Sequence, residues 1–150
     1  VLLTPGVVHD RVLVASRDGL VHGLRLADGV AVYGVRCAGA PVTPVAVGGG
    51  LFGVVDERGG LRVHRADTGQ AISEGTVSQT QSAGLVLVPG PAPTFAVIET
   101  GGQLIAVDLA TRTTRFTVPT GQSNSSVPVV SGGLVVAATT FGQLYGIVAP

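Results

Sequence analysis

Residues 102–112 read Gly-Gln-Leu-Ile-Ala-Val-Asp-Leu-Ala-Thr-Arg, and this stretch decides the fold because related stretches recur along the chain. The glycines that open the four copies are Gly19, Gly59, Gly102 and Gly142, and they are spaced by 40, 43 and 40 residues. A regular period of about 40 residues in a β-rich sequence is typical of a propeller or a solenoid.

Each repeat also contains four short runs that favour β-structure. The runs before the glycines are residues 11–16, 51–56, 94–99 and 134–139, and they are rich in Val, which suits a pleated, half-buried surface. Gly, Asp, Pro and Ser cluster at the breaks between runs. Four strands in about 40 residues make one propeller blade. We therefore predict an all-β fold, a β-propeller of about four four-stranded antiparallel blades. The blades would span residues 4–37, 43–77, 83–118 and 127–150 of a single domain or half-propeller.

The turn between the third and fourth strands has a recognisable signature. In Asp28-Gly29 and Asp67-Thr68-Gly69 the aspartate can accept a hydrogen bond from the backbone two residues on, and glycine readily adopts the left-handed conformation. Arg112 stands where the third repeat should have that glycine. We expect this turn either to differ from the others or to carry strain.

The repeat resembles the pyrroloquinoline-quinone-like propeller repeat, which is found in quinoprotein dehydrogenases and in non-enzymatic bacterial envelope proteins. Residues 104–108 and 144–147 match the centre of the family's blade, and residues 66–69 match its turn. Tyr33 and Phe116 stand where the family has a Trp that docks one blade on the next, whereas Ser73 does not fit there. The resemblance covers nearly the whole chain. It is specific for the propeller fold and much less specific for an activity.

The titratable residues do not form a recognisable catalytic or metal-binding pattern. His9, His22 and His64 fall at different blade positions, which argues against a central ring of metal ligands. The resemblance implies that the quinone enzymes hold their cofactor against a Trp and a vicinal Cys pair, beside Ca²⁺ and a catalytic Asp. This chain has no Trp and only one Cys. We therefore predict a non-enzymatic protein without a cofactor or a metal.

Acidic residues in two adjacent turns allow a Ca²⁺ site, but a simpler role is preferred. Asp18, Asp56 and Glu57 could supply oxygen ligands. They lie next to Arg17 and Arg58, so turn capping and local ion pairs are the preferred interpretation.

Composition excludes other classes of function. The formal net charge is zero and only 12% of the residues are charged, so nucleic-acid binding has no support from a basic patch. No apolar run reaches the ~18 residues that a membrane-spanning helix needs, and no targeting signal is visible. The single Cys37 excludes an intramolecular disulfide and is expected to be a small side chain in the connection between two blades.

The number of strands leaves the closure of the ring open. The last repeat provides only three runs, and Val1-Leu2-Leu3 precedes the first run, so residues 1–3 could supply the missing outer strand and close a four-bladed ring. Alternatively, two copies could pair as half-rings into an eight-bladed propeller, or the chain could be a piece of a longer propeller.

The blade geometry predicts where a partner would bind. Turns between second and third strands should emerge on the same face as the connections between blades, and ligand contacts usually lie on loops over a rigid scaffold. The polar and charged residues expected on this loop face are Arg17, Asp18, Asp56, Glu57, Arg58, Gln79, Gln81, Glu99, Thr100, Gln103, Gln122, Ser123 and Asn124.

The expected function is therefore a scaffold or binding module for a protein or glycan partner. The resemblance implies a bacterial cell envelope or secreted location. Two alternatives remain at this point: a quinone-dependent dehydrogenase or a degenerate relative of one, and an extracytoplasmic sensor domain of a receptor or kinase.

Overall fold

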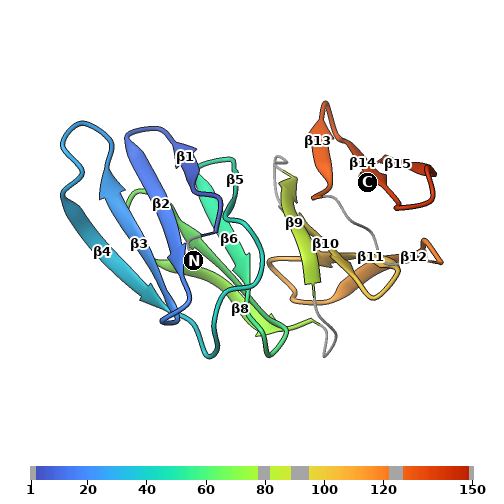
Figure 1. Ribbon diagram of the computed structural model, residues 1–150, viewed down its shortest axis with the longest axis horizontal. Coiled ribbons are helices and arrows are strands. Elements are labelled where there is room, and N and C mark those ends of the chain that lie inside the picture. Colours follow the sequence, from blue (N-terminus) through green and yellow to red (C-terminus); the bar gives the residue numbers. More distant parts are fainter. Residues whose placement is uncertain (1–2, 78–81, 89–94, 122–126, 149–150) are drawn as a thin grey trace.

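The computed structural model describes residues 3–77, 82–88, 95–121 and 127–148 (Figure 1). These residues form four antiparallel sheets, one per sequence repeat, and no helix. Within every sheet, strands that are consecutive in sequence are neighbours in space. The prediction of an all-β propeller with antiparallel blades is confirmed.

The sheets are numbered as blades 1 to 4. Blade 1 contains β1 (Gly6–Val8), β2 (Arg11–Ser16), β3 (Leu20–Arg25) and β4 (Ala31–Arg36). Blade 2 contains β5 (Ala46–Gly48), β6 (Leu51–Val55), β7 (Gly60–Arg65) and β8 (Ala71–Thr76). Blade 3 contains β9 (Ser82–Val88), β10 (Phe95–Thr100), β11 (Gln103–Asp108) and β12 (Thr114–Pro119). Blade 4 contains β13 (Val129–Ser131), β14 (Leu134–Ala138) and β15 (Leu144–Val148), so its sheet has three strands among the described residues.

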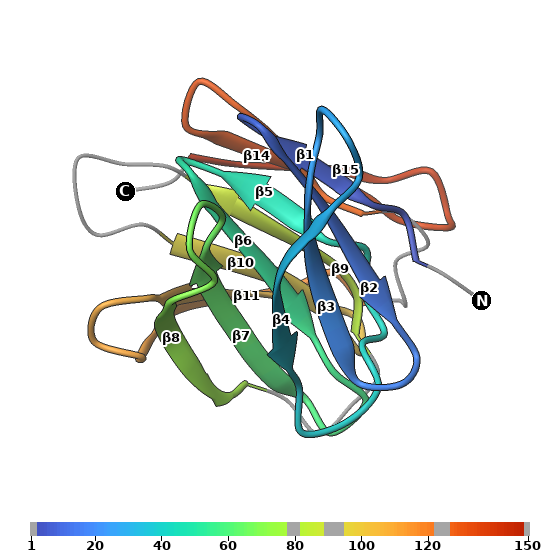
Figure 2. The same cartoon turned by 90° about the vertical axis from the view of Figure 1, so that its left-hand side faces the viewer.

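The blades stack face to face because both faces of the inner blades are apolar. One buried cluster joins blades 1 and 2 around Leu13, Val21 and Phe52. A second joins blades 2 and 3, and a third joins blades 3 and 4. Side chains alternate between the two faces of a strand, so one strand serves two clusters: Val54 of β6 packs towards blade 1 and Val55 packs towards blade 3. Figure 2 shows the sheets of blades 1 to 3 layered in this order.

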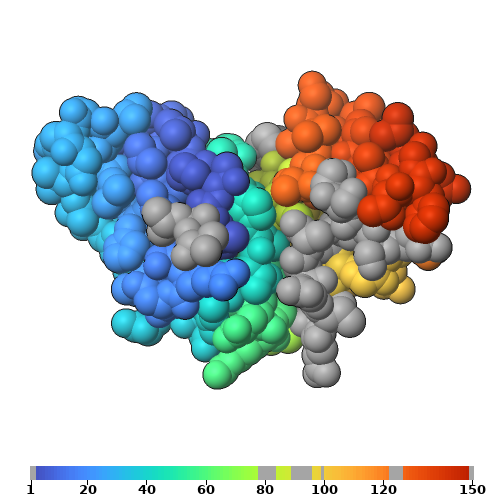
Figure 3. All heavy atoms as spheres, in the orientation of Figure 1, coloured from blue at the N-terminus to red at the C-terminus, as the bar shows by residue number. Residues whose placement is uncertain are grey.

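The four blades form an open row rather than a closed ring. The first strands β1, β5, β9 and β13 succeed one another along the inside of the row. Blades 1 and 4 lie at opposite ends, and Figure 3 shows a notch between their surfaces. No buried cluster among the described residues joins these two blades.

Leu3 does not form the outer strand of blade 4. For this residue, the expectation that residues 1–3 close the ring is wrong. Its amide donates to the carbonyl of Ala15 in blade 1 at 3.5 Å, and its side chain packs on the cluster between blades 1 and 2. The amide of Thr43 makes the equivalent bond to Val55 in blade 2 at 3.4 Å. Leu3 therefore belongs to the connection that leads into blade 1. Val1 and Leu2 lie outside the described residues.

Tyr33 docks blade 1 on blade 2, as its match to the docking Trp of the repeat implies. Its ring stacks on Phe52 with a centroid separation of 6.3 Å, and its hydroxyl donates to the carbonyl of Ala66 at 2.6 Å. Phe116 packs similarly against the cluster between blades 3 and 4. Ser73 is buried without providing such a ring.

The residue opposite each of these side chains compensates for its size. Gly23 pairs with Tyr33 across the sheet, and a Cβ atom at Gly23 would collide with the Tyr33 ring. In blade 2 the small Ser73 is opposite Val63, and in blade 3 Phe116 is opposite Ala106. A larger side chain on the outer strand therefore goes with a smaller one on the neighbouring strand.

We predict that Tyr33→Ala lowers the free energy of unfolding by about 3 kcal/mol, because it removes a ring contact and a hydrogen bond between two blades. Denaturant unfolding followed by circular dichroism measures the change. The control is Val32→Ala on the same strand, whose side chain is exposed and whose loss should cost no more than about 0.5 kcal/mol. Equal effects of the two substitutions would contradict the docking role.

The turn of blade 3 keeps the shape of the other turns and carries the strain expected from its sequence. The amides of Gly29, Gly69 and Arg112 donate to the carbonyls four residues earlier at 2.8, 2.9 and 2.8 Å. Arg112 has a φ of 60°, in the left-handed region that the two glycines also occupy. Asp108 holds the turn closed by accepting from the amides of Ala110 and Thr111, and the Thr111 bond is the main reason why the pKa of Asp108 lies below its usual value.

We predict that Arg112→Gly raises the free energy of unfolding by about 1 kcal/mol, because glycine removes the left-handed strain. The reciprocal change, Gly29→Arg, should lower it by a similar amount, since the space beside Gly29 is open and only its φ of 72° opposes a side chain. Thermal unfolding of both variants measures the two shifts. A destabilised Arg112→Gly variant would show that the arginine side chain outweighs the strain.

Candidate partner-binding face

Repeated backbone hydrogen bonds bring the blade connections and the second-to-third-strand turns to one face, as predicted. The amides of Cys37, Val77 and Thr120 donate to the carbonyls of Gly19, Gly59 and Gly102 at 2.8, 2.9 and 2.8 Å. Each connection therefore starts beside the turn of its own blade. On the opposite face, the amides of Leu26 and Ala66 donate to the carbonyls of Asp10 and Gly50 at the remaining turns.

Asp56 fixes the shape of the loop face where blades 1 and 2 meet. Its buried carboxylate accepts from the amides of Arg58 at 3.0 Å and Gly60 at 2.9 Å within its own turn. It also accepts from the amide of Gly39 at 3.3 Å, in the connection from blade 1. The amide of Glu57 donates to the carbonyl of Ala40 at 2.8 Å and holds the same two segments together. Turn capping, the preferred interpretation of this carboxylate, is the role that the contacts show.

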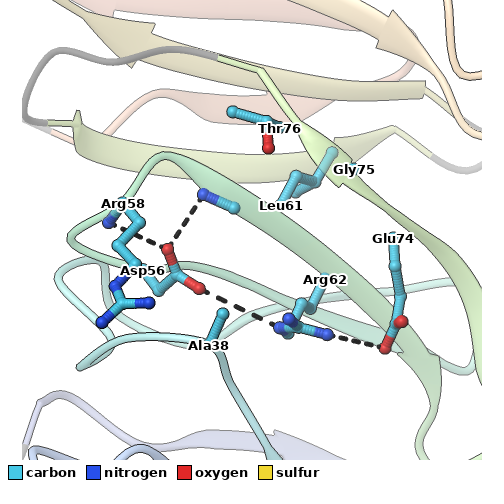
Figure 4. A pocket seen from close by; sticks show the side chains of 9 residues that line it. Ala38, Asp56, Arg58, Leu61, Arg62, Glu74, Gly75 and Thr76 are labelled. Atoms are coloured by element: carbon cyan, nitrogen blue, oxygen red, sulfur yellow. Dashed lines mark hydrogen bonds and ion pairs between the residues drawn. The ribbon is translucent and has the colours of Figure 1, made fainter.

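A cavity of about 380 Å³ opens beside this turn. Figure 4 shows Asp56, Arg58, Arg62 and Glu74 along its wall. Arg62 connects two carboxylates, with Nη1 2.9 Å from Glu74 and Nε 4.0 Å from Asp56. The Glu74 side chain is 45% exposed, so it remains available to a ligand at the rim of the cavity. The wall therefore presents charges of both signs close together.

His64 supports this wall from inside the molecule. It is buried, its ring stacks on Phe52 with a centroid separation of 5.5 Å, and its Nδ1 lies 3.0 Å from the carbonyl of Gly69. Its Nε2 atom lies 3.3 Å from Glu74 Oε1. His64 therefore links the cavity wall to the packing between blades 1 and 2.

A second cavity of about 320 Å³ lies against the same connection and brings two predicted residues together. Arg17 and Glu57 both line it, although they belong to different blades. The remaining wall is apolar and is formed by Leu3 and residues 40–42. The two cavities share a single geometric cause, which is the passage of residues 38–42 over the turn of blade 2.

The predicted site residues are partly gathered on this face. Arg17, Asp18, Glu57, Arg58 and Gln103 are exposed. Asp56 and Thr100 are buried, and Asp56 reaches this face only as part of the wall of the first cavity. The predicted residues that lie outside the described part are Gln79, Gln81, Gln122, Ser123, Asn124 and the side chain of Glu99.

Arg62 and Glu74 were missed when the sequence was considered alone, and His64 was considered there only as a possible metal ligand. Arg62 and His64 alternate along β7, which places both on the face of blade 2 that is turned towards blade 1, and Glu74 faces Arg62 across the sheet. Charged residues at alternating positions of an otherwise apolar strand were the available signal.

Cys37 occupies the start of the connection between blades 1 and 2, as expected. It is buried, and this burial raises the pKa of its thiol. A thiol that is held protonated is a poor nucleophile. Among the described residues, no group of three or more His, Cys, Asp or Glu side chains is arranged to hold a metal ion. The described part of the chain also has no helix that is long and apolar enough to span a membrane.

Comparisons with known proteins agree with this architecture. The family model for the outer membrane protein assembly factor BamB matches residues 57–149. The crystal structure of the computationally designed Ika4 protein has a TM-score of 0.80 and 14% identity, covering 100% of this chain and 92% of that chain. The crystal structure of BamB from Moraxella catarrhalis has a TM-score of 0.69 and 20% identity, covering 93% of this chain and 43% of that chain. No curated protein matches the sequence.

The fold and the family model define the class first: the chain is a β-propeller built from quinoprotein-like repeats. The match over residues 57–149 then shows that the chain belongs to the family of the outer membrane protein assembly factor BamB. The chain spans less than half the length of the Moraxella protein. At these identities the two solved structures support the fold and not a specific activity.

Proposed function

We propose that this chain is a non-enzymatic binding module for a protein partner in the bacterial envelope, and that the partner docks on the loop face. The observation that carries the proposal is the pair of charged cavities on either side of residues 38–42. Hydrogen bonds from Gly39 and Gly60 to the Asp56 carboxylate hold the connection and the turn beside the first cavity in place, so little conformational freedom would be lost there on binding.

The chemistry of the two cavities fits a protein surface better than a glycan. Arg58, Arg62 and Glu74 offer charged donors and acceptors, which complement mixed charges on a partner. Among the described residues, neither cavity wall includes an aromatic side chain on which a sugar ring could stack. The family description, an assembly factor for outer membrane proteins, also supports a protein partner and an envelope location. No contact among the described residues favours the dehydrogenase or the sensor alternative.

The exposed faces of the end blades support self-association as a second property. In blade 4 the side chains of Val129, Leu134 and Val148 are exposed. They lie on the face that is directed away from blade 3, which corresponds to the face that each inner blade packs against the next blade. In blade 1 the side chain of Val7 is exposed on the face that is directed away from blade 2. We propose that blade 4 of one copy packs on blade 1 of a second copy, which completes an eight-bladed ring with two-fold symmetry.

The test of the loop face uses the triple variant R17A/E57A/R58A. The control is R25A/R65A/D67A, which changes the net charge by the same amount and lies at the turns on the opposite face. Each variant removes two arginines and one carboxylate from exposed positions. We predict that the purified chain retains an envelope protein from a bacterial membrane extract, and that the loop-face variant weakens this affinity about tenfold, or about 1.4 kcal/mol. Pull-down followed by titration with the identified protein measures the loss.

The control variant should bind as the unsubstituted chain does, since its exposed ion pairs lie away from the cavities. Substitution of Gln79, Gln81 and Asn124 by Ala tests the remaining part of the predicted face. Unchanged affinity in both loop-face variants would refute docking at this face, and retention of glycans instead of a protein would refute the class of partner.

A further inference from the structure

The cavity between blades 1 and 2 is enclosed by residues that the structure describes without a gap. Its wall contains Ala38 of the connection after blade 1, the turn that follows β6, and residues of β7 and β8. Its volume of about 380 Å³ is in the range of cavities that bind small ligands, so a side chain of a partner can enter it. The chemistry of this wall therefore indicates what kind of group the loop face accepts.

The acceptor groups of the wall are largely occupied within the molecule. The buried Asp56 carboxylate accepts from the amides of Arg58 and Gly60, at 3.0 and 2.9 Å. It also accepts from the amide of Gly39 at 3.3 Å. The guanidinium of Arg58, by contrast, lies within ion-pair distance of no carboxylate among the described residues. The wall therefore has spare hydrogen-bond donors and few spare acceptors.

Arg62 contributes a donor that its own neighbours do not satisfy. Its side chain is only 19% exposed, and its Nε atom is buried without a hydrogen-bond partner. Asp56 Oδ2 is 4.0 Å from that Nε atom, which is too far for a hydrogen bond (Figure 4). A buried unsatisfied donor costs free energy, so an oxygen ligand that reaches this guanidinium would remove part of that cost.

Glu74 shows that a carboxylate fits beside Arg62, although it is held weakly there. Its Oε1 atom lies 2.9 Å from Arg62 Nη1 and 3.3 Å from His64 Nε2. His64 Nδ1 lies 3.0 Å from the carbonyl oxygen of Gly69, which can only accept, so Nδ1 carries the proton. Nε2 of the neutral ring then presents a lone pair to Oε1 and repels it. Because the Glu74 side chain is also 45% exposed, turning it into water costs little.

We propose that this cavity binds a carboxylate of the partner protein, which replaces Glu74 beside Arg62 and is also attracted by Arg58 in the same wall. This rests on the proposed function and names the group that the first cavity recognises. Glu74 is a placeholder in the free chain: it pairs with Arg62 until a partner enters, and it then turns outwards into water. The incoming carboxylate approaches from the cavity, whose wall does not include His64.

An ammonium group of a partner fits the same wall less well. Arg58 and Arg62 would repel it, and the Asp56 carboxylate already accepts from the backbone. A lysine would also have to draw Glu74 away from Arg62, which would leave that buried guanidinium with less compensating charge. The carboxylate can belong to an aspartate or glutamate side chain or to a chain terminus, and the test separates these sources.

Binding is measured by nuclear magnetic resonance on the intact, isotopically labelled chain. One probe is acetyl-Gly-Glu-Gly-amide, and a second, acetyl-Gly-Gly-Gly with a free carboxyl end, represents a chain terminus. We expect at least one of these acidic probes to cause saturable shifts of the Arg62 guanidinium signals at millimolar concentration. The neutral probe acetyl-Gly-Gln-Gly-amide should bind about tenfold more weakly, or about 1.4 kcal/mol.

Glu74→Gln tests the placeholder, and Asp67→Asn is its matched control. Each substitution removes one half-exposed carboxylate that pairs with an arginine of blade 2, and Asp67 lies at a turn on the opposite face. We expect E74Q to strengthen binding of the acidic probe about fivefold, or about 1 kcal/mol, because the competing carboxylate is gone. D67N should leave the affinity unchanged.

Arg62→Lys tests the guanidinium itself without leaving the neighbouring carboxylates uncompensated. Lysine keeps the positive charge but loses the planar pair of donors, so the acidic probe should bind about tenfold more weakly. Circular dichroism checks that this variant keeps the fold.

The proposal is wrong if neither acidic probe causes saturable shifts, or if the acidic and neutral probes bind equally well. Equal effects of E74Q and D67N would also overturn it, because they would reduce the effect at Glu74 to a change in net charge. Tighter binding of acetyl-Gly-Lys-Gly-amide than of either acidic probe would identify a cationic group as the ligand instead.

The same variants separate this site from the proposed function. If R17A/E57A/R58A loses the envelope partner while E74Q changes the affinity for neither the partner nor the probes, docking at the loop face stands and the carboxylate site fails. If E74Q strengthens the acidic probe as expected while R17A/E57A/R58A keeps the partner, the carboxylate site stands and docking at the loop face fails.

Discussion

Face-to-face docking of apolar sheets is the interaction on which the rest of this structure depends. A four-stranded blade with two apolar faces cannot bury both by itself, so each blade needs a neighbour on either side. The contact between blades 1 and 2 shows how the fit is achieved: the Tyr33 ring covers Gly23 within its own sheet and reaches Phe52 and the carbonyl of Ala66 in the next. The same requirement explains why the end blades, and not the inner ones, present uncovered apolar faces.

Docking also determines the chemistry of the loop face. Because blades 1 and 2 are held at a fixed separation, the connection of residues 38–42 passes directly over the turn that contains Asp56. The buried carboxylate ties the two segments together and leaves Arg17, Glu57 and Arg58 exposed around them. Loops held on a rigid frame are the usual place for ligand contacts, and the proposed docking of a partner protein rests on this arrangement. Membership of the BamB family is consistent with that use.

Local rules made much of this architecture predictable from the sequence. The spacing of the repeated glycines predicts the number of blades. The Asp and Gly residues predict where the turns lie, and the residue at the position of Tyr33 predicts the side chain that docks one blade on the next. At Arg112 the sequence allowed two outcomes, a turn of different shape or a strained turn of the same shape. The structure shows that the turn keeps its shape and that Arg112 adopts the left-handed backbone conformation. The cavity lined by Arg62 and Glu74 was not predictable, because it depends on a connection from another blade. The place of Leu3 was not predictable either, since a short apolar segment fits a closing strand and a blade connection equally well.

The measurement that tests this account most directly is the absolute mass of the folded chain in solution, from light scattering behind size exclusion, with circular dichroism on the same peak. If exposed blade faces require a covering blade, the chain of 15.0 kDa should form a folded, concentration-dependent species of twice that mass. The dimer should dissociate when Val148 is replaced by Arg and persist when the exposed Ile72 of the covered blade 2 is replaced by Arg. A stably folded monomer at all concentrations would show that a blade face can remain uncovered, and it would contradict the central claim.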